Sequence, residues 1–369
     1  MSDIQDTVLH VGGAAPYDVV IGRDLADRLP GILGESVQRV ALIHSERLDE
    51  LVAPLLTRLN DSFDVLALGV PDGERAKSAE VAYQCWEALG EAGFTRSDAI
   101  VTFGGGATTD MGGFVAATWL RGVRVIHVPT TLLAMVDASV GGKTGINTAA
   151  GKNLVGSFHE PAGVLCDLDL LRTLPGPELV AGMGEVVKCG FIADPEILRL
   201  VEADPSAALD VDGPVLRELV ERSVRVKIDV VVADLKETGG VDGHPGREIL
   251  NYGHTMAHAI ERATSYGIRH GEAVAIGCCF AAEVARTSGL LSDEVADRHR
   301  TAFAAVGLPI GFDGAEFDEL ETTMRVDKKS RGSQLRFVVL HDLADPRILA
   351  GPTDRALRAA YAVMTKVPR

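Results

Sequence analysis

The stretch "AIVTFGGGATTDMGGFVAA", residues 99–117, decides the fold that we expect for the first half of the chain. A β-branched apolar run leads into Gly104, Gly105 and Gly106, and a helical pattern follows. These glycines would let the backbone approach a phosphate closely, and the helix N-terminus behind them would favour its negative charge. Because Thr109 stands where a dinucleotide-binding turn has its third glycine, the turn alone fits a plain packing turn equally well.

The same alternation of strand and helix extends outward from this turn. The strand candidates are residues 17–22, 39–44, 64–69, 99–106 and 123–131, and the helix candidates between them are residues 46–59, 77–92 and 108–119. Such alternation predicts a mostly parallel, Rossmann-like sheet with helices on both faces.

The pattern changes after "LRTLPGPE", residues 171–178. Helical spacing dominates from there on, in residues 178–193, 195–203, 214–233, 246–265, 271–288 and 293–305, with one strand candidate at 335–340. The two prolines and the glycine at 175–177 mark a boundary. We therefore expect an α/β domain at residues 1–175 and a mainly helical domain at residues 176–369.

Composition limits the partners and the compartment. A net charge of −16 over 369 residues argues against nucleic acid or an anionic membrane surface as a general partner, although a small anionic substrate remains compatible. The five cysteines form no CxxC pair and are expected to be buried and reduced. No signal-like N-terminal segment and no membrane-length apolar run are found, so we expect a cytoplasmic protein.

Two polar features accompany the glycine turn. The segment "PDGERAKS" supplies Glu74 and Lys77 ahead of a helix, a pair suited to ribose hydroxyl groups. The segment "VPTT" ends a strand with the hydroxyls of Thr130 and Thr131. Each feature alone is explained equally well by ordinary loop polarity, but together with the glycines they favour a nucleotide site.

The strongest pattern in the second half is "GREILNYGHTMAHAIERA", residues 246–263. Arg247, Asn251, His254 and His258 are spaced at i, i+4, i+7 and i+11, which places them on one face of a single α-helix. Four polar side chains in register would make a poor core and an unusually patterned solvent face. The spacing therefore indicates a functional face.

Two further segments offer partners for these histidines. His270 precedes an apolar helix, and Glu185 and Lys188 stand at i, i+3 in another. Because a buried carboxylate must be paired or bound to a metal, Glu185, His254 and His270 could form a two-imidazole, one-carboxylate catalytic zinc site. The alternative is that Glu185 pairs with Lys188 and the histidines lie at helix ends or on the surface; spacing alone cannot show that three segments meet.

These segments resemble the 3-dehydroquinate synthase family. The matching motifs are "PDGERAKS", "GGGATTD", "LRGVRVIHVPTTLLAMVDASVGGKTGIN", "GKNLVGSFHEP", "LRTLPGPELVAGMGEVVKCG", "NYGHTMAHAIE", "HGEAVAIG" and "DKKSRG", in order over residues 70 to 332. The resemblance implies an α/β NAD domain followed by a helical metal domain, a fold shared with glycerol dehydrogenases.

The resemblance also implies roles for individual residues. The implied zinc or cobalt ligands are Glu185, His254 and His270. The implied NAD contacts are Glu74, Lys77, Asp110, Thr130, Thr131 and Lys143. The implied substrate contacts are Asp137, Lys152, Asn153, Lys188, Lys227, Arg247, Asn251 and His258, with Lys328 or Lys329 closing over the substrate. Arg121 is implied to reach the substrate phosphate of a neighbouring subunit in a homodimer.

The implied reaction converts 3-deoxy-D-arabino-heptulosonate 7-phosphate to 3-dehydroquinate and phosphate, a carbon–oxygen lyase step of the shikimate pathway to aromatic amino acids. In the family, NAD oxidises a hydroxyl transiently, phosphate is eliminated, the ketone is reduced again and an intramolecular aldol closes the ring.

Two alternatives use the same fold. Amino-dehydroquinate and valiolone-type cyclases of secondary metabolism share the metal and NAD, but the intact "VGGKTGIN" at 140–147 favours dehydroquinate synthase. A metal-dependent polyol dehydrogenase would release NADH stoichiometrically. Phosphate release without accumulation of NADH distinguishes the lyase from the dehydrogenase.

Overall fold

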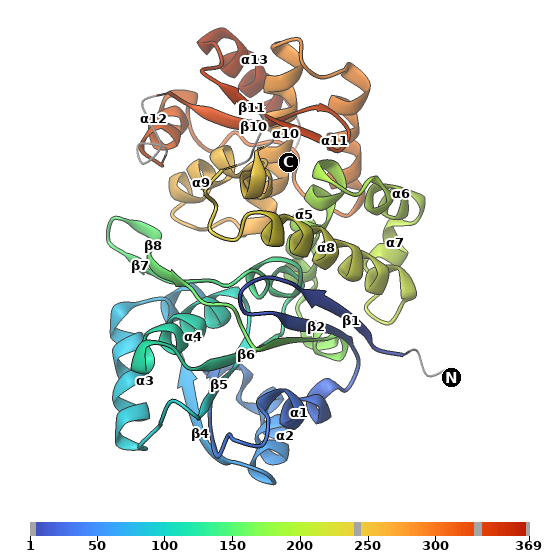
Figure 1. Cartoon of the computed structure of the whole chain (residues 1–369). Coiled ribbons are helices and arrows are strands. Elements are labelled where there is room, and N and C mark those ends of the chain that lie inside the picture. Colours follow the sequence, from blue (N-terminus) through green and yellow to red (C-terminus); the bar gives the residue numbers. More distant parts are fainter. Residues whose placement is uncertain (1–4, 240–244, 328–333, 367–369) are drawn as a thin grey trace. The chain divides into compact units, whose positions relative to one another are not determined.

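Strand–helix alternation gives way to helices at a boundary between Leu174 and Pro175, where the chain divides into two units (Figure 1). The computed structural model describes residues 5–239, 245–327 and 334–366. The first unit is an α/β sheet structure, and the second is mainly helical. The expected fold class is therefore confirmed.

The first unit is built on a seven-stranded sheet in the order β1-β2-β9-β6-β5-β3-β4. Its strands are β1 (Thr7–Val11), β2 (Tyr17–Gly22), β3 (Arg39–Ser45), β4 (Asp64–Val70), β5 (Ala99–Gly104), β6 (Arg124–Pro129) and β9 (Gly163–Asp167). Only the edge strand β1 pairs antiparallel, and all other neighbours in the sheet are parallel. The sequence patterns anticipated β2 to β6, whereas β1 and β9 were not predicted.

Helices cover both faces of this sheet. The helices are α1 (Leu29–Leu33), α2 (Asp49–Asn60), α3 (Ala79–Glu91) and α4 (Gly106–Thr118). Alternate residues of β3 point to opposite cores: Val40 and Leu42 pack with α1 and α2, and Ala41 and Ile43 pack with α3 and α4. Figure 1 shows the two helix pairs on opposite sides of the strands. The strands are consequently buried on both faces, as expected of a parallel sheet.

Shorter elements complete the first unit. The hairpin of β7 (Lys143–Thr148) and β8 (Gly151–Phe158) is a separate antiparallel ribbon, drawn in green in Figure 1, and it packs against α4. The short helical elements are η1 (Leu25–Arg28), η2 (Glu46–Leu48), η3 (Gly73–Ala76), η4 (Trp119–Arg121), η5 (Ala134–Ala138) and η6 (Leu168–Thr173).

The second unit is organised around α10 (His270–Thr287), which is buried along nearly its whole length. The other helices are α5 (Gly176–Ile192), α6 (Pro195–Ala203), α7 (Pro205–Ala208), α8 (Pro214–Ala233), α9 (His254–Ala263), α11 (Asp293–Ala305), α12 (Phe317–Asp327) and α13 (Asp354–Met364). Helices α5, α9, α11 and α13 all pack against α10. None of the helices that the structure describes has the length and apolar character needed to cross a membrane.

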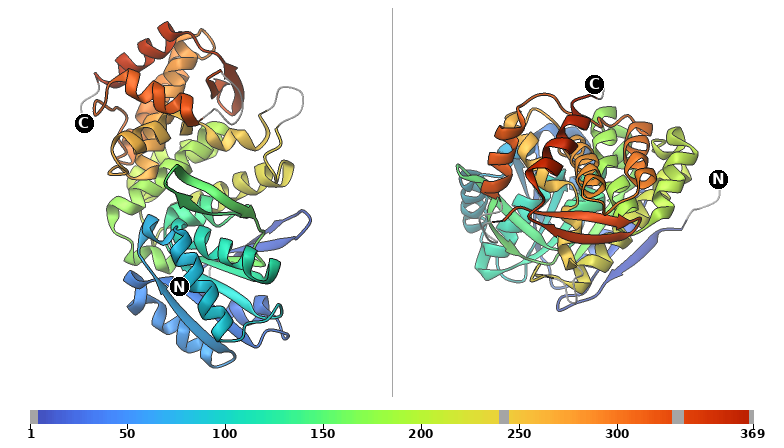
Figure 2. Two further views of the ribbon diagram at one scale, coloured as in Figure 1. Left: turned by 90° about the vertical axis from the view of Figure 1, so that its left-hand side faces the viewer. Right: turned by 90° about the horizontal axis from the view of Figure 1, so that it is seen from above.

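A two-stranded ribbon also packs on α10. Strand β10 (Arg336–Asp342) overlaps the strand expected at 335–340, and it pairs antiparallel with β11 (Asp345–Ala350), which was not predicted. Figure 2 shows this ribbon in orange-red among the helices.

The single helix expected over 246–265 is wrong. Residues Gly246–Asn251 form a 3-10 turn, η7, and a new helix, α9, begins at His254. The break falls at Gly253, which has a φ of 80° and lies so close to α10 that a Cβ there would stand 2.7 Å from the backbone nitrogen of Cys278. Tertiary packing therefore interrupts the helical register, and Arg247 and Asn251 do not share one α-helical face with His254 and His258.

Candidate active site and metal centre

Three side chains that are distant in sequence converge in the second unit. Glu185 comes from the middle of α5, His254 is the first residue of α9, and His270 is the first residue of α10. One ligand atom from each lies within 4.8 Å of the others, so the three together could hold a metal ion. The convergence that sequence spacing could not establish is thus present.

The two oxygens of Glu185 have different surroundings. The residue is 1% exposed, and Oε2 pairs with the Lys188 ammonium one helical turn further on. Among the described residues, Oε1 has no hydrogen-bond partner. It lies instead 3.5 Å from Nε2 of His254 and 3.6 Å from Nε2 of His270.

These separations fit a shared metal ion. Ligand atoms at about 2.1 Å from a tetrahedral zinc ion stand roughly 3.4 Å apart. A buried carboxylate oxygen without a donor is costly, and a cation between it and the two imidazoles would remove that cost. The donor set of one carboxylate and two imidazoles suits zinc or cobalt and leaves coordination positions for a substrate.

Each histidine is held from its other ring nitrogen. Nδ1 of His254 lies 3.2 Å from the carbonyl oxygen of Tyr252, and Nδ1 of His270 lies 3.4 Å from Oε1 of Glu261. When Nδ1–H donates to such an oxygen, the neutral ring presents the lone pair of Nε2 to a metal.

The electrostatics of the cluster follow from burial and close charges. Although burial alone would raise it, Lys188 and the two histidines hold the pKa of Glu185 well below its usual range. Burial and the Lys188 charge lower the pKa of His254 well below its usual value, so this imidazole is neutral. Burial opposes protonation of His270 as well, but Glu185 and Glu261 raise its pKa to about 10. A metal ion at Nε2 would therefore displace a proton from His270.

Two of the further residues expected in the site lie beside this cluster, and a third is buried on α8. Lys188 Nζ also donates to the carbonyl oxygen of Leu250, 2.7 Å away. The ring centroid of His258 lies 5.5 Å from that of His254 and 6.4 Å from that of His270. Lys227 is buried on α8, on the same helix face as neighbouring core residues. Lys188 and His258 thus lie beside the candidate ligands.

Arg247 and Asn251 are held by the segment that follows α8. The buried guanidinium of Arg247 donates to the carbonyl oxygen of Leu235 at 2.6 Å. Asn251 Nδ2 donates to Oε1 of Glu237 at 3.1 Å. Glu237 was not predicted from the sequence, because a polar loop residue carries no spacing signal. Glu261 was not predicted either, although its seven-residue spacing from His254 could have indicated a shared helix face.

In the first unit, the expected cofactor residues follow the carboxyl ends of neighbouring strands. Gly104 ends β5, Gly105 and Gly106 begin α4, Thr130 and Thr131 follow β6, and Glu74 and Lys77 follow β4. The backbone N–H of Thr130 donates to the carbonyl oxygen of Gly104 at 3.0 Å, which ties the two turns together. A Cβ at Gly104 would stand 2.6 Å from Oγ1 of Thr108, so this position requires glycine. Ligands of open α/β sheets bind at this edge of the sheet.

Lys77 is the centre of a polar cluster at this edge. Its buried ammonium contacts both the Asp110 carboxylate on α4 and Oδ1 of Asn153 in the hairpin. Burial raises the pKa of Asp110, while Lys77 opposes that shift. Asn147, which sequence analysis did not single out, donates to Oε2 of Glu74 at 2.6 Å and accepts from the backbone N–H of Asn153 at 3.0 Å.

Of the remaining expected residues of the first unit, Lys152 and Asp137 interact with members of this cluster, and Arg121 lies apart from it. Lys152 Nζ is 3.6 Å from Oε1 of Glu74, and the charge of Asp137 acts on Asp110. Lys143 is exposed at the start of β7. Arg121 is exposed in η4 after the end of α4, about 20 Å of helix from the glycine turn. It is therefore not brought together with the others. Lys328 and Lys329 lie outside the described residues.

Comparison with solved structures places this architecture in a class. The structure of 2-deoxy-scyllo-inosose synthase complexed with carbaglucose-6-phosphate, NAD+ and Co2+ superimposes with a TM-score of 0.85 at 26% sequence identity, covering 96% of this chain and 98% of that one. This chain, with an α/β unit followed by a helical unit, thus shares its architecture with a sugar phosphate cyclase.

Sequence comparison identifies the family within this class. The N-terminal model of 3-dehydroquinate synthase matches residues 67–181, and the C-terminal model matches residues 182–330. The 3-dehydroquinate synthase of Thermobifida fusca (strain YX) is 56% identical over 363 residues, 98% of this chain and 97% of its own length. That of Arthrobacter sp. (strain FB24) is 57% identical over 368 residues, 97% of this chain and 98% of its own. The chain belongs to the 3-dehydroquinate synthase family, and the resemblance noted from its motifs is confirmed.

Proposed function

We propose that the chain catalyses the 3-dehydroquinate synthase reaction, converting 3-deoxy-D-arabino-heptulosonate 7-phosphate to 3-dehydroquinate and phosphate. It is thus a carbon–oxygen lyase of the shikimate pathway. The observation that carries this proposal is the buried Glu185 Oε1 between two imidazole nitrogens, in a chain more than half identical to synthases of that name. A complete ligand set argues against an inactive relative.

Glu185, His254 and His270 would hold the divalent metal, zinc or cobalt, and residues 176–369 would form the metal- and substrate-binding domain. When bound, such a metal polarises a substrate oxygen and stabilises developing negative charge on it. Lys188 neutralises Glu185 through Oε2, which keeps Oε1 directed at the two imidazoles. The imidazole of His258 beside them would accept and return a proton of a substrate hydroxyl.

Residues 1–175 would form the NAD-binding domain. Gly104, Gly105 and Gly106 would admit the pyrophosphate to the N-terminus of α4, and Thr130 and Thr131 would donate hydroxyls to it. Glu74, Lys77 and Asp110 would hold ribose hydroxyls, and Lys143 would lie beside the cofactor. When bound, NAD would accept a hydride from the substrate carbon that bears a hydroxyl and would return it later, so the overall reaction is redox-neutral.

The cations of the chain would bind the carboxylate and phosphate of the substrate. Arg247 and Lys227 offer buried positive charge, which is stronger than surface charge because water does not screen it. Lys188, whose charge Glu185 balances, would contribute a hydrogen bond to the substrate. Lys152, Asn153, Asn251 and Asp137 would orient hydroxyls and phosphate. We assign Arg121 to the phosphate of a neighbouring subunit in a homodimer, Lys328 or Lys329 to closure over the substrate, and the cytoplasm as the compartment.

The test is phosphate release from the heptulosonate phosphate by purified protein, with and without NAD and with and without a metal chelator. We expect phosphate release that depends on both and no accumulation of NADH. Stoichiometric NADH without phosphate would establish a polyol dehydrogenase instead. Faster turnover of the imino counterpart of the substrate would establish an amino-dehydroquinate synthase.

A further inference from the structure

Glu261 is a buried carboxylate that the proposed chemistry does not use. It lies on α9, is 4% exposed, and follows His254 by seven residues, so both side chains are on one face of the helix. A buried carboxylate needs a hydrogen-bond or charge partner. Its Oε1 lies 3.4 Å from Nδ1 of His270.

His270 therefore has a carboxylate at each ring nitrogen. Nε2 is 3.6 Å from Oε1 of Glu185, and Nδ1 is 3.4 Å from Oε1 of Glu261. His254 differs, because its Nδ1 faces the neutral carbonyl oxygen of Tyr252. The side chain of His270 is also more exposed, at 29% against 13% for His254, so packing holds its ring less firmly.

The charge of Glu261 matters as well as its position. Lys188 neutralises Glu185, so this ion pair presents no net charge to a divalent cation. Glu261 supplies a negative charge at the outer side of His270. A carboxylate behind a metal-bound imidazole orients the ring and increases its basicity.

We propose that Glu261 is a positioning residue of the metal centre, which fixes His270 as the Nδ1–H tautomer and strengthens the metal bond at Nε2. This inference rests on the proposed function, since it requires that Glu185, His254 and His270 bind a metal. The backbone carbonyl of Glu261 accepts from the N–H of Tyr266, a contact that substitution of the side chain preserves.

The experiment measures zinc affinity by competition with a chromophoric chelator in wild type, Glu261→Ala and Glu261→Gln. Loss of an outer-shell partner of this kind weakens metal binding by about 10–100-fold, which we expect for Glu261→Ala. Glu261→Gln should lose less, because the amide oxygen still accepts from Nδ1–H. The matched control is Glu272→Gln, which removes a carboxylate charge two residues from His270 at the start of α10 while keeping an acceptor for the Arg269 N–H; its affinity should equal that of wild type.

Spectroscopy provides a second measurement. Histidine ¹⁵N shifts of the zinc-loaded wild type should show a proton on Nδ1 of His270, and the visible spectrum of cobalt-loaded protein should change in Glu261→Ala. A wild-type affinity in both Glu261 variants, an equal loss in Glu272→Gln, or an Nδ1 without a proton would overturn the inference. Wild-type protein that binds no zinc would instead overturn the metal assignment of the proposed function, so the two failures are distinguishable.

Discussion

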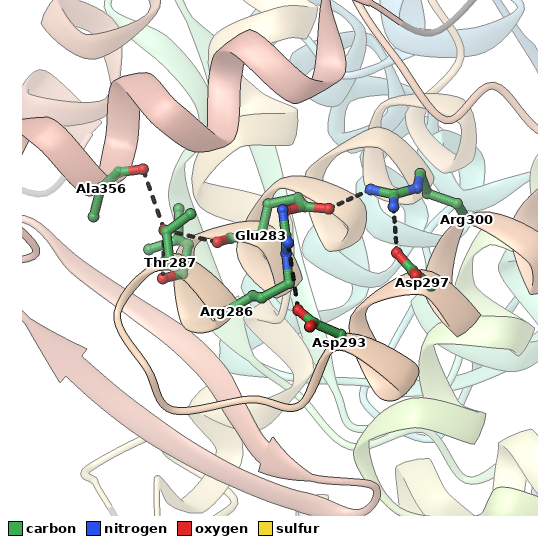
Figure 3. Close-up of polar contacts among 8 residues, drawn as sticks. Glu283, Arg286, Thr287, Asp293, Asp297, Arg300 and Ala356 are labelled. Carbon is green, nitrogen blue, oxygen red and sulfur yellow. Dashed lines mark hydrogen bonds and ion pairs between the residues drawn. The ribbon is translucent and has the colours of Figure 1, made fainter.

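Two buried carboxylates of the second unit look alike in sequence and differ in structure. Glu185 precedes Lys188 on α5, and Glu283 precedes Arg286 on α10, each at i, i+3 and each 1% exposed. Arg286 Nε donates to Oε2 of Glu283 at 2.8 Å, and Arg300 of α11 donates to Oε1 (Figure 3). Both oxygens of Glu283 are satisfied, whereas Oε1 of Glu185 has no hydrogen-bond partner among the described residues.

The difference separates a structural carboxylate from a ligand. An ion pair that closes both oxygens holds two helices together, here α10 and α11, and has no capacity left for a metal. A buried carboxylate oxygen that accepts no hydrogen bond costs free energy unless a bound ion or ligand interacts with it. The i, i+3 pairing of an acid and a base is therefore not what identifies the site. The metal site is identified instead by a carboxylate oxygen that accepts no hydrogen bond and faces two imidazole nitrogens.

The largest expected effect tests this distinction at Glu185. In Glu185→Gln the amide oxygen can still accept from Lys188, but the charge facing the imidazoles is lost. We expect zinc affinity to fall by more than the roughly 100-fold upper limit for outer-shell partners, and phosphate release to fall with it. Metal content after gel filtration and steady-state turnover measure the two losses. Wild-type zinc content in this variant would make Glu185 a structural residue like Glu283.

The effect of zinc on the free energy of unfolding should distinguish Glu185 from Glu283. A ligand at 100 times its Kd that binds only the folded state adds about 2.7 kcal/mol to the free energy of unfolding. We expect this gain in wild type and Glu283→Gln, and its absence in Glu185→Gln. Thermal unfolding with zinc and with excess chelator measures it. An equal zinc effect in all three proteins would mean that the ion binds elsewhere.

Glu283→Gln should affect stability and leave chemistry intact. Breaking a fully buried ion pair costs about 3–5 kcal/mol, but the side chains of Arg286 and Arg300 are 32% and 25% exposed and regain hydration. We therefore expect a loss of about 2 kcal/mol in the free energy of unfolding, measured by denaturant titration. Turnover per folded molecule and zinc content should match wild type. An unchanged stability would show that the network of Figure 3 contributes nothing measurable.

Much of the fold could be predicted because its signals are local. β-branched runs predicted β2 to β6, and helical apolar spacing predicted α5, α8 and α10 within a few residues. Strands β1, β9 and β11 escaped because a single short run does not show whether a distant strand will pair with it. The break before α9 escaped for a related reason: the conformation of Gly253 is imposed by the backbone of α10 at Cys278.

The candidate metal ligands could be predicted from the sequence, but the residues that hold the site residues in position could not. Glu185 and the histidines stand out because charged or imidazole groups in apolar helices need an explanation. The supporting contacts join residues 9, 14 and 6 positions apart: Glu261 with His270, Glu237 with Asn251, and Asn147 with Asn153. The chain turns between the two residues of each pair, and residue spacing does not reveal the geometry of such turns. Spacing identifies groups on one element, whereas these partners meet between elements.

The same contrast, between polar atoms with and without hydrogen-bond partners, applies to the histidines. The smallest expected effect is a change in the pH dependence of stability at His299. His299 is fully buried, Nδ1–H donates to the carbonyl oxygen of Val295 and Nε2 accepts from the Tyr252 hydroxyl, each at 2.8 Å. Both nitrogens are satisfied, so this ring is structural, whereas Nε2 of His254 and of His270 faces the open oxygen of Glu185. Burial, with the charges of Arg298 and Arg300, lowers the pKa of His299 to about 3.

A histidine kept neutral in the folded state makes stability depend on pH. The unfolded ring has a pKa of about 6.5, so the stability it contributes is present above pH 6.5 and is lost as pH falls toward 3. Between pH 6 and pH 5 this linkage amounts to about 1 kcal/mol. Gln does not titrate, so metal-free His299→Gln should lose about 1 kcal/mol less than metal-free wild type over that interval, measured by denaturant titration at both pH values. Equal losses in the two proteins would mean that His299 takes up a proton while folded, which would contradict a neutral ring whose Nε2 accepts from the Tyr252 hydroxyl.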